Sequence, residues 1–222
     1  MEEEKNIKLY TKGEEIFNAV THIAGGAFGI AVLVLGVVFA SLYNDAFAVA
    51  AMAVYGVGMI TLYTASSIYH FLRQNKAKRV FRILDHCSIF LLIAGTYTPF
   101  CLITLRTAGA WGWALFGVIW FSAAVGITFN AINMHNKIVG RLSMAAYLAM
   151  GWSAVAAFVP LVQNLRLAGL LWTLAGGIAY TAGAIFYALG RKVKYFHSVW
   201  HLFILAGSVL QFIGIIFYVV LA

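Results

Sequence analysis

Charged side chains are scarce in this sequence, and acidic ones are the scarcest. Only 10% of the 222 residues are Asp, Glu, Lys or Arg, only seven residues are acidic, and 63% are hydrophobic. A typical soluble domain is about a quarter charged and about 45–50% apolar. A chain of this composition would present a largely apolar exterior to water. The composition therefore excludes an ordinary soluble protein and predicts an integral membrane protein.

Cysteine and proline are also rare, with two residues of each type. Cys87 and Cys101 lie in the same apolar run, where a helix would separate them by about 21 Å along its axis, too far for a disulfide. The cysteines therefore say nothing about redox compartment. Pro99 lies in the same apolar run as the cysteines and Pro160 lies in a later run, and we expect each to kink its helix.

The features of a secretory signal are missing as well. The sequence begins MEEEK, which is acidic where a signal peptide carries positive charge, and no polar mature protein follows the first apolar run. We therefore expect no cleaved signal peptide.

Long apolar runs make up most of the chain. A bilayer core about 30 Å thick needs roughly 20 apolar residues for each helical span. Seven runs of this kind occur, at about 19–42, 46–72, 83–105, 111–130, 142–162, 169–189 and 197–221. They are continuous, whereas the strands of a membrane barrel alternate over about 10 residues. The sequence predicts an all-α membrane protein, with an N-terminal tail at 1–18 and a seven-helix transmembrane bundle at 19–222.

The basic residues fall almost entirely on one side of this predicted bundle. One side receives only Arg106 and Arg166. The other receives thirteen: Lys5, Lys8, Lys12, Arg73, Lys76, Lys78, Arg79, Arg82, Lys137, Arg141, Arg191, Lys192 and Lys194. Short cytoplasmic loops carry such an excess. We therefore expect a multi-pass protein of the inner (plasma) membrane, with a cytoplasmic N-terminus and an external C-terminus.

The net charge of +8 does not in itself indicate nucleic acid. Basic cytoplasmic loops are usual in membrane proteins, and residues 73–82 (RQNKAKRVFR) fit that pattern. Each basic residue near the surface gains about 1 kcal/mol from anionic headgroups. We therefore expect membrane lipids as partners and no nucleic acid.

Several polar residues interrupt the apolar runs, and they share one depth. Asp85 is the one acidic residue inside a run, where a carboxylate costs on the order of 2.5–3.5 kcal/mol. Successive helices cross the membrane in opposite directions. The end of the second run and the starts of the first, third and seventh runs therefore all lie in the cytoplasmic third of the membrane. Five histidines lie at these positions: His22, His70, His86, His197 and His201.

The spacing of these residues favours a metal site. His197 and His201 are four residues apart, which places them on one helix face, and Ser66 and His70 have the same spacing. Three imidazoles and the Asp85 carboxylate, from the second, third and seventh spans, match a zinc site with an open position for water. The alternative is that the histidine pair only packs at the membrane interface.

Taken together, the motifs resemble the progestin and adipoQ receptor family, and within it the bacterial hemolysin III branch. The likeness covers essentially the whole chain. Its parts are Glu-x2-Asn-x2-Thr-His in EIFNAVTH (15–22), Ser-x3-His at Ser66 and His70, the aspartate Asp85 opening the third span, and His-x3-His at His197 and His201.

The resemblance implies a particular set of roles. In the adiponectin receptors of this family the matching histidines bind zinc, so His70, His197 and His201 are the expected ligands. The matching aspartate holds a zinc-bound water, which makes Asp85 a candidate general base. Ser66 is then expected beside the ligands or as an oxyanion partner.

Two further groups keep alternatives open. His86 stands where receptor members carry an aromatic residue, and it points about 100° away from Asp85. We expect it to face a neighbouring helix, with a fourth ligand or a proton relay as the alternative. Glu15, Asn18, Thr21 and His22 serve either in capping and helix packing or in orienting the zinc ligands through their second ring nitrogens.

Related membrane ceramidases share these residue types, so the resemblance implies a zinc-dependent hydrolase acting on a lipid amide or ester. The alternative is a non-enzymatic, zinc-stabilised regulator or sensor of membrane lipid homeostasis. The branch name also suggests cytolysis, although the runs contain no polar stripe that would line a pore. Ion or proton transport is a further alternative, motivated by Asp85 and the histidines.

Overall fold

Seven helical spans make up nearly all of the part of the chain that is described. The computed structural model describes residues 10–134, 136–190 and 193–222, and these form no β-strand. The spans are α1 (Lys12–Tyr43), α2 (Ala46–Phe71), α3 (Lys76–Pro99) with a π-helical turn (Phe100–Thr104), α4 (Trp111–Asn133), α5 (Lys137–Gly151) with a 3-10 turn (Ser153–Ala157) and α6 (Phe158–Asn164), α7 (Leu167–Leu189), and α8 (Phe196–Ile215) with a second π-helical turn (Ile216–Val220). The predicted all-α, seven-span membrane fold is confirmed.

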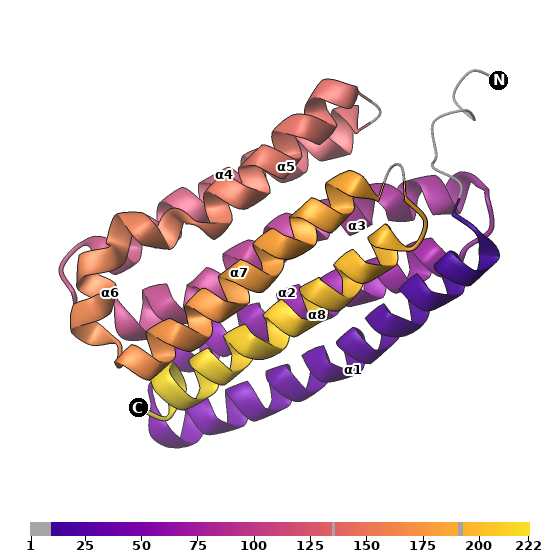
Figure 1. Cartoon of the computed structure of the whole chain (residues 1–222). Helices are drawn as coiled ribbons and strands as arrows, with labels where there is room; N and C mark the ends of the chain where they lie inside the picture. Colours follow the sequence, from indigo (N-terminus) through magenta and orange to yellow (C-terminus); the bar gives the residue numbers. More distant parts are fainter. Residues whose placement is uncertain (1–9, 135, 191–192) are drawn as a thin grey trace.

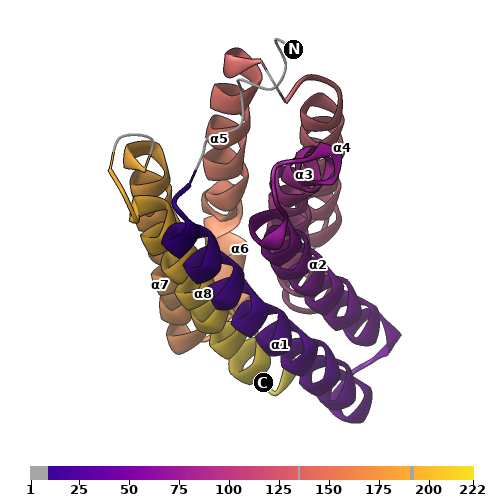
Figure 2. The ribbon, with the colours of Figure 1, turned by 90° about the vertical axis from the view of Figure 1, so that its right-hand side faces the viewer.

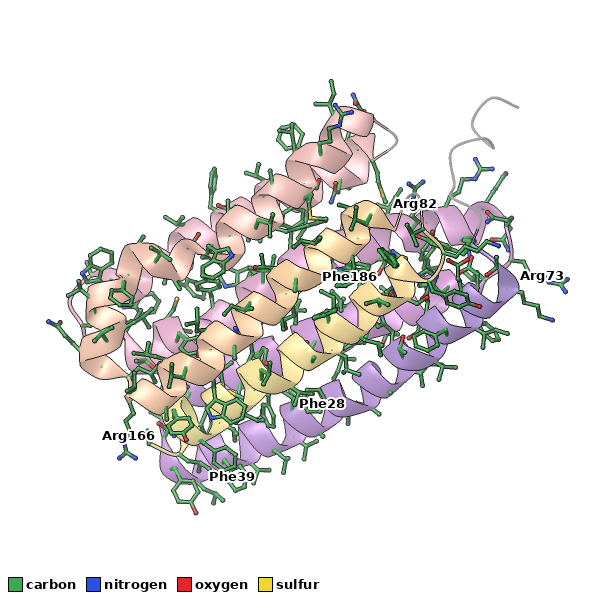
Figure 3. The ribbon with its side chains drawn as sticks, in the orientation of Figure 1. Phe28, Phe39, Arg73, Arg82, Arg166 and Phe186 are labelled. Atoms are coloured by element: carbon green, nitrogen blue, oxygen red, sulfur yellow. The ribbon has the colours of Figure 1, made fainter. Side chains whose placement is uncertain are left out.

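The spans form a ring in chain order, which α8 closes by packing against both α7 and α1 (Figures 1 and 2). Of the neighbouring spans, α5 and α7 contact each other least. We call the end of the ring where α1, α3, α5 and α8 begin the basic end. Arg73 and Arg82 lie at this end, and Arg166 lies at the opposite end (Figure 3).

The outside of the ring is apolar, and its helices approach closely through glycine. Phe121, Ile23 and Ile185 are more than half exposed, as expected of side chains that face lipid. Between α1 and α2 the separation is so small that a methyl group on Gly56 would lie 2.7 Å from the Cα atom of Leu33. Small residues at such contacts allow van der Waals packing in a solvent as apolar as the side chains themselves.

Several helices begin earlier than the apolar runs because polar caps start them, and α1 and α3 begin about seven residues earlier. The Thr11 side chain accepts a hydrogen bond from the backbone of Glu14, whose carboxylate accepts one from the backbone of Thr11, so α1 begins at Lys12. The Asn75 side chain likewise accepts from the backbone of Lys78, so α3 begins at Lys76. Most of the predicted basic connection at 73–82 is therefore helix. Of the predicted basic positions, Lys5, Lys8, Arg191 and Lys192 lie outside the described residues.

Both prolines mark departures from α-helix. In an α-helix the ring of Pro160 would clash with the backbone carbonyl group of residue 156. At this place a 3-10 turn (Ser153–Ala157) divides the fifth span into α5 and α6. Pro99 is the last residue of α3, and the π-helical turn follows it directly. The kink predicted at Pro160 is thus a full interruption of the helix.

Candidate metal centre

Three buried histidines from two helices meet at the basic end. His70 lies in the last turn of α2, and His197 and His201 lie in the first two turns of α8. Each offers one nitrogen, and these atoms all lie within 4.8 Å of one another. The Nε2 atoms of His197 and His201 are 3.2 Å apart. The structure therefore brings together the three residues that were predicted as metal ligands.

The start of α8 is fixed by an unusual backbone conformation. Tyr195, the residue before the helix, has a φ of 61°, in the left-handed region that few residues other than glycine adopt. Its backbone N–H donates to Oε1 of Glu14 on α1, at 2.9 Å. This contact places the first turn of α8, with His197, against the first turn of α1.

A partly buried ion pair lies behind His70. Glu15 on α1 has its Oε2 atom 2.6 Å from Nδ1 of His70, and its Oε1 atom accepts a hydrogen bond from Nζ of Lys78 at 2.7 Å. The Lys78 ammonium also donates to the backbone oxygen of Leu72 at 3.0 Å, and the residue is only 1% exposed. The expectation that Lys78 belongs to a headgroup-facing basic loop was wrong, because α3 already includes this residue and turns it inward.

The two nitrogens of His70 fit a metal ligand. A carboxylate only accepts hydrogen bonds, so Nδ1 carries a proton and, in the neutral ring, Nε2 holds the lone pair. That Nε2 atom is buried and has no hydrogen-bond partner among the described residues. A buried acceptor left without a donor costs about 1–3 kcal/mol. A bound cation would satisfy it, and the three imidazoles could therefore hold a metal ion.

His22 on α1 packs on this group without joining it. Its ring stacks on that of His201, with centroids 3.7 Å apart, and meets the edge of Tyr63 at 5.0 Å. Neither of its ring nitrogens has a hydrogen-bond partner among the described residues. His22 thus supports His201 through its ring face.

The other residues of the 15–22 motif separate into two roles. Glu15 contacts His70 directly, whereas Nδ2 of Asn18 lies 3.5 Å from the same Nδ1 atom, at the limit of a hydrogen bond. Thr21 donates only to backbone oxygens of its own helix, those of Phe17 and Asn18. Glu15 is therefore the residue of this motif that contacts the second ring nitrogen of His70, whereas Thr21 forms hydrogen bonds only within α1.

Asp85 and Ser66 lie beside the three histidines. The Asp85 carboxylate is buried, lies 3.9 Å from Nδ1 of His86, and is within electrostatic range of His70. The Ser66 hydroxyl is buried and interacts with this carboxylate. Asp85 therefore has Ser66, His86 and His70 around it.

His86 faces its neighbours, as expected from its position on α3. Its Nδ1 atom lies 3.0 Å from the backbone oxygen of Arg82, and its Nε2 atom lies 3.5 Å from the hydroxyl of Tyr187 on α7. The ring is not part of the three-histidine group.

Tyr10 covers the group from the N-terminal side, and sequence reasoning missed it. Its ring stacks on His197 at 4.7 Å and meets His70 edge-on at 5.6 Å. Burial raises the pKa of the Tyr10 phenol well above its usual value, so the group is neutral at physiological pH. Tyr10 precedes the first motif, and no spacing relates it to the histidines.

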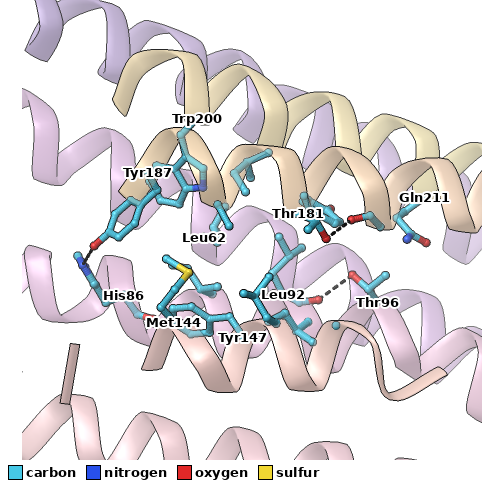
Figure 4. Close-up of a pocket in the computed structure, with 18 of the residues that line it drawn as sticks. Leu62, His86, Leu92, Thr96, Met144, Tyr147, Thr181, Tyr187, Trp200 and Gln211 are labelled. Carbon is cyan, nitrogen blue, oxygen red and sulfur yellow. Dashed lines mark hydrogen bonds between the residues drawn. The ribbon is translucent and has the colours of Figure 1, made fainter. Parts of the chain in front are cut away.

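A pocket with about 1060 Å³ of empty space, including its open side, runs through the ring between α3, α5, α7 and α8 (Figure 4). His86 and Tyr187 lie at one end, and Thr96 and Gln211 lie at the other. Asp85, the residue before His86 on α3, also lines the pocket. Along α3 the pocket extends for about 16 Å from Asp85 to Thr96. The walls between these ends are mostly apolar.

The pocket and the three histidines are adjacent but distinct. His70, His197 and His201 do not line the pocket, whereas His22 and Trp200 do. The Trp200 ring lies 4.9 Å from that of His197, and the His22 ring stacks on His201. Asp85, which lines the pocket and neighbours His70, stands at the boundary between the two.

The fold and these residues define a seven-helix membrane protein with a buried three-histidine group that could hold a metal ion. Comparisons with known proteins place it more narrowly. The family described as "Haemolysin-III related" matches residues 10–212, and this chain belongs to that family. The family expected from the motifs is thereby confirmed.

Three relatives illustrate the range of similarity. Hemolysin-3 of Bacillus cereus is 45% identical over 206 residues, 93% of this chain and 92% of the relative. The hemolysin-3 homolog of Bacillus subtilis (strain 168) is 39% identical over 212 residues, 96% and 97%. The human monocyte to macrophage differentiation factor is 26% identical over 167 residues, 73% and 67%.

Proposed function

We propose that this protein is a zinc-dependent hydrolase that cleaves an amide or ester bond of a membrane lipid. The observation that carries the proposal is the position of Asp85, between a buried three-histidine group and a long apolar pocket. A hydrolase of this kind needs a metal site, a proton acceptor and a space for an acyl chain in contact with one another.

The donor set supports zinc. His70, His197 and His201 would hold the ion, since zinc takes imidazole nitrogens and a catalytic zinc keeps three protein ligands with one open position. When bound, such an ion supplies Lewis acidity and lowers the pKa of its water from 15.7 to about 7.

The side chains around this site would divide the remaining work. A carboxylate oxygen of Asp85 would accept the proton of the attacking water and return it to the leaving amine or alcohol. The Ser66 hydroxyl, which is buried beside Asp85, would donate to the developing oxyanion of the substrate. The apolar walls of the pocket would hold the acyl chain and exclude water from it.

The basic end would place this chemistry near the cytoplasmic leaflet. Arg73 and Arg82 lie at the end of the ring that carries the histidines. An excess of basic residues is typical of the cytoplasmic side. An amide or ester close to a lipid headgroup would then lie at the depth of Asp85, with its acyl chain along the pocket.

Purified protein in nanodiscs provides the test, with metal content and release of fatty acid from N-acyl and O-acyl lipids as the two measurements. We expect about one zinc per chain in the wild type and loss of zinc in His201→Ala, because three protein ligands are needed. We expect Asp85→Asn to keep its zinc and to lower turnover by at least about 100-fold. Unchanged turnover in Asp85→Asn would rule out Asp85 as the base, and zinc-loaded wild type without turnover would rule out the hydrolase.

A second candidate function is a zinc-stabilised regulator of membrane lipid state. It is favoured by the way the site connects helices, since His70 lies on α2, His197 and His201 lie on α8, and His22 and Glu15 lie on α1. A metal there would hold these helices together even without catalysis. Zinc-loaded protein that resists unfolding but turns over no lipid would support this candidate.

A further inference from the structure

We infer that Lys78 and Glu15 form a positioning pair that orients His70 for metal binding. The inference rests on the metal site of the proposed function and not on hydrolysis. Neither residue reaches the three-histidine group as a ligand, so both would act through His70.

The chain of contacts is continuous, with Lys78 and His70 buried and Glu15 partly buried. The Lys78 ammonium donates to Oε1 of Glu15 at 2.7 Å, and Oε2 of Glu15 lies 2.6 Å from Nδ1 of His70. Each carboxylate oxygen thus has a different partner, and the carboxylate cannot rotate without breaking both contacts. A charge-assisted hydrogen bond of this length is about twice as strong as a neutral one.

This arrangement determines which nitrogen of His70 is available. With Nδ1 as the donor to Glu15, the neutral ring carries its lone pair on Nε2, and it is this atom that is buried without a partner among the described residues. If Glu15 were absent, Asn18 would be the remaining polar contact, at 3.5 Å. A side-chain amide can donate or accept, so it would leave both tautomers of His70 accessible.

Lys78 is held more firmly than an ion pair alone requires. Its ammonium also donates to the backbone oxygen of Leu72, at 3.0 Å, and lies 4.8 Å from the centre of the Tyr69 ring. Burying an ammonium is costly, and apolar residues usually replace a buried ion pair without loss of stability. Stability alone is therefore a poor explanation for this pair, whereas fixing the carboxylate behind a metal ligand is a sufficient one.

The test measures zinc affinity of the full-length protein by competition with a chelator, alongside the thermal midpoint of the metal-free protein. We expect Glu15→Gln to weaken zinc binding by about 10- to 100-fold, the usual effect of removing a partner behind a metal-bound histidine. Lys78→Met should weaken it in the same direction, and Lys78→Arg, which keeps the charge, should weaken it less. Lys76→Met is the matched control, because Lys76 lies in the same first turn and is exposed.

The double variant Glu15→Gln/Lys78→Met separates positioning from a purely structural role. It removes both charges, so it folds even if a lone buried charge in a single variant prevents folding. Positioning predicts that its zinc affinity stays about 10- to 100-fold below wild type and no worse than that of Glu15→Gln, although its stability is restored. Affinity within about threefold of wild type would overturn the inference.

The outcomes also distinguish this inference from the proposed function. Wild-type protein that binds zinc but turns over no lipid would remove the hydrolase and leave the positioning pair intact. Zinc binding and turnover in the wild type, with no loss of affinity in the double variant, would remove the pair alone. Wild-type protein that binds no metal would overturn both.

Discussion

The two ring nitrogens of His70 have different surroundings, and this difference shows how an imidazole is prepared inside an apolar bundle. One nitrogen faces a carboxylate, and the other is buried without a partner among the described residues. His22, one helix away, has no hydrogen-bond partner there for either nitrogen and is held by ring stacking. Two buried histidines at the same depth therefore have different contacts, which their positions in the sequence do not distinguish.

At the same scale, Asp45 gives a prediction about pH. Its side chain caps α2, and the hydrogen bond from Arg106 holds the pKa of the Asp45 carboxyl below its usual value of 3.8. A carboxyl with a lowered pKa stabilises the folded state above about pH 4, and this contribution is lost as pH falls through the lowered value. Asp45→Asn keeps a capping side chain but cannot titrate.

We therefore expect the thermal midpoints of wild type and Asp45→Asn to differ by a constant amount at neutral pH and to converge below about pH 4. Arg106→Ala should show the same convergence, because it removes the other partner. A difference that persists unchanged at the lowest pH would contradict the assignment of Arg106 as the cause.

The sequence was sufficient to predict some residues of the site and not others. Helix periodicity and the alternation of helix direction placed five histidines, His70, His197 and His201 among them, at one depth, and the family resemblance assigned these three as ligands. Lys78 and Tyr10 could not be found in this way. Their positions depend on where α3 begins and on how the residues before α1 fold back, and neither depends on apolar periodicity.

At the scale of the helices, α1 and α2 pack so closely that there is almost no room for a larger side chain at Gly56. Gly56→Ala would place a methyl group 2.7 Å from the Leu33 backbone, which cannot move aside as a flexible side chain can. We expect a loss of about 1–3 kcal/mol in the free energy of unfolding. Gly117→Ala is the control, since nothing lies within 4 Å of that position.

Gly117→Ala should be neutral or stabilising by up to about 1 kcal/mol, because alanine favours the helix. Reversible unfolding in mixed micelles measures both variants. Equal stability of the two would show that α1 and α2 can separate, contrary to the close packing described here.

The bounds of the helices were predicted less well than their number. Apolar length gives the count of spans, whereas capping decides where each begins. The capping box formed by Thr11 and Glu14 can be recognised in the sequence as TKGE, but a search for apolar runs does not detect it. The interruption at Ser153–Ala157 follows from the ring of Pro160, although the sequence alone indicated only a kink.

For the whole molecule, the separation of basic residues predicts the orientation in the membrane. Single-cysteine labelling with an impermeant reagent tests it, and the native cysteines give little background because Cys87 and Cys101 are buried. We expect Arg166→Cys to react in intact cells and Arg73→Cys to react only after the membrane is permeabilised. The reverse pattern would show that the basic end faces outward.

The three-histidine group joins the second span to the seventh, and this has a consequence for biogenesis. His70, Glu15 and Lys78 lie within the first three spans and can come together while the ribosome is still translating the chain. His197 and His201 enter the bilayer only with the final span. The metal site of the proposed function would therefore be complete only after the whole polypeptide is made, and a bound ion would mark a chain whose seven spans have all been inserted.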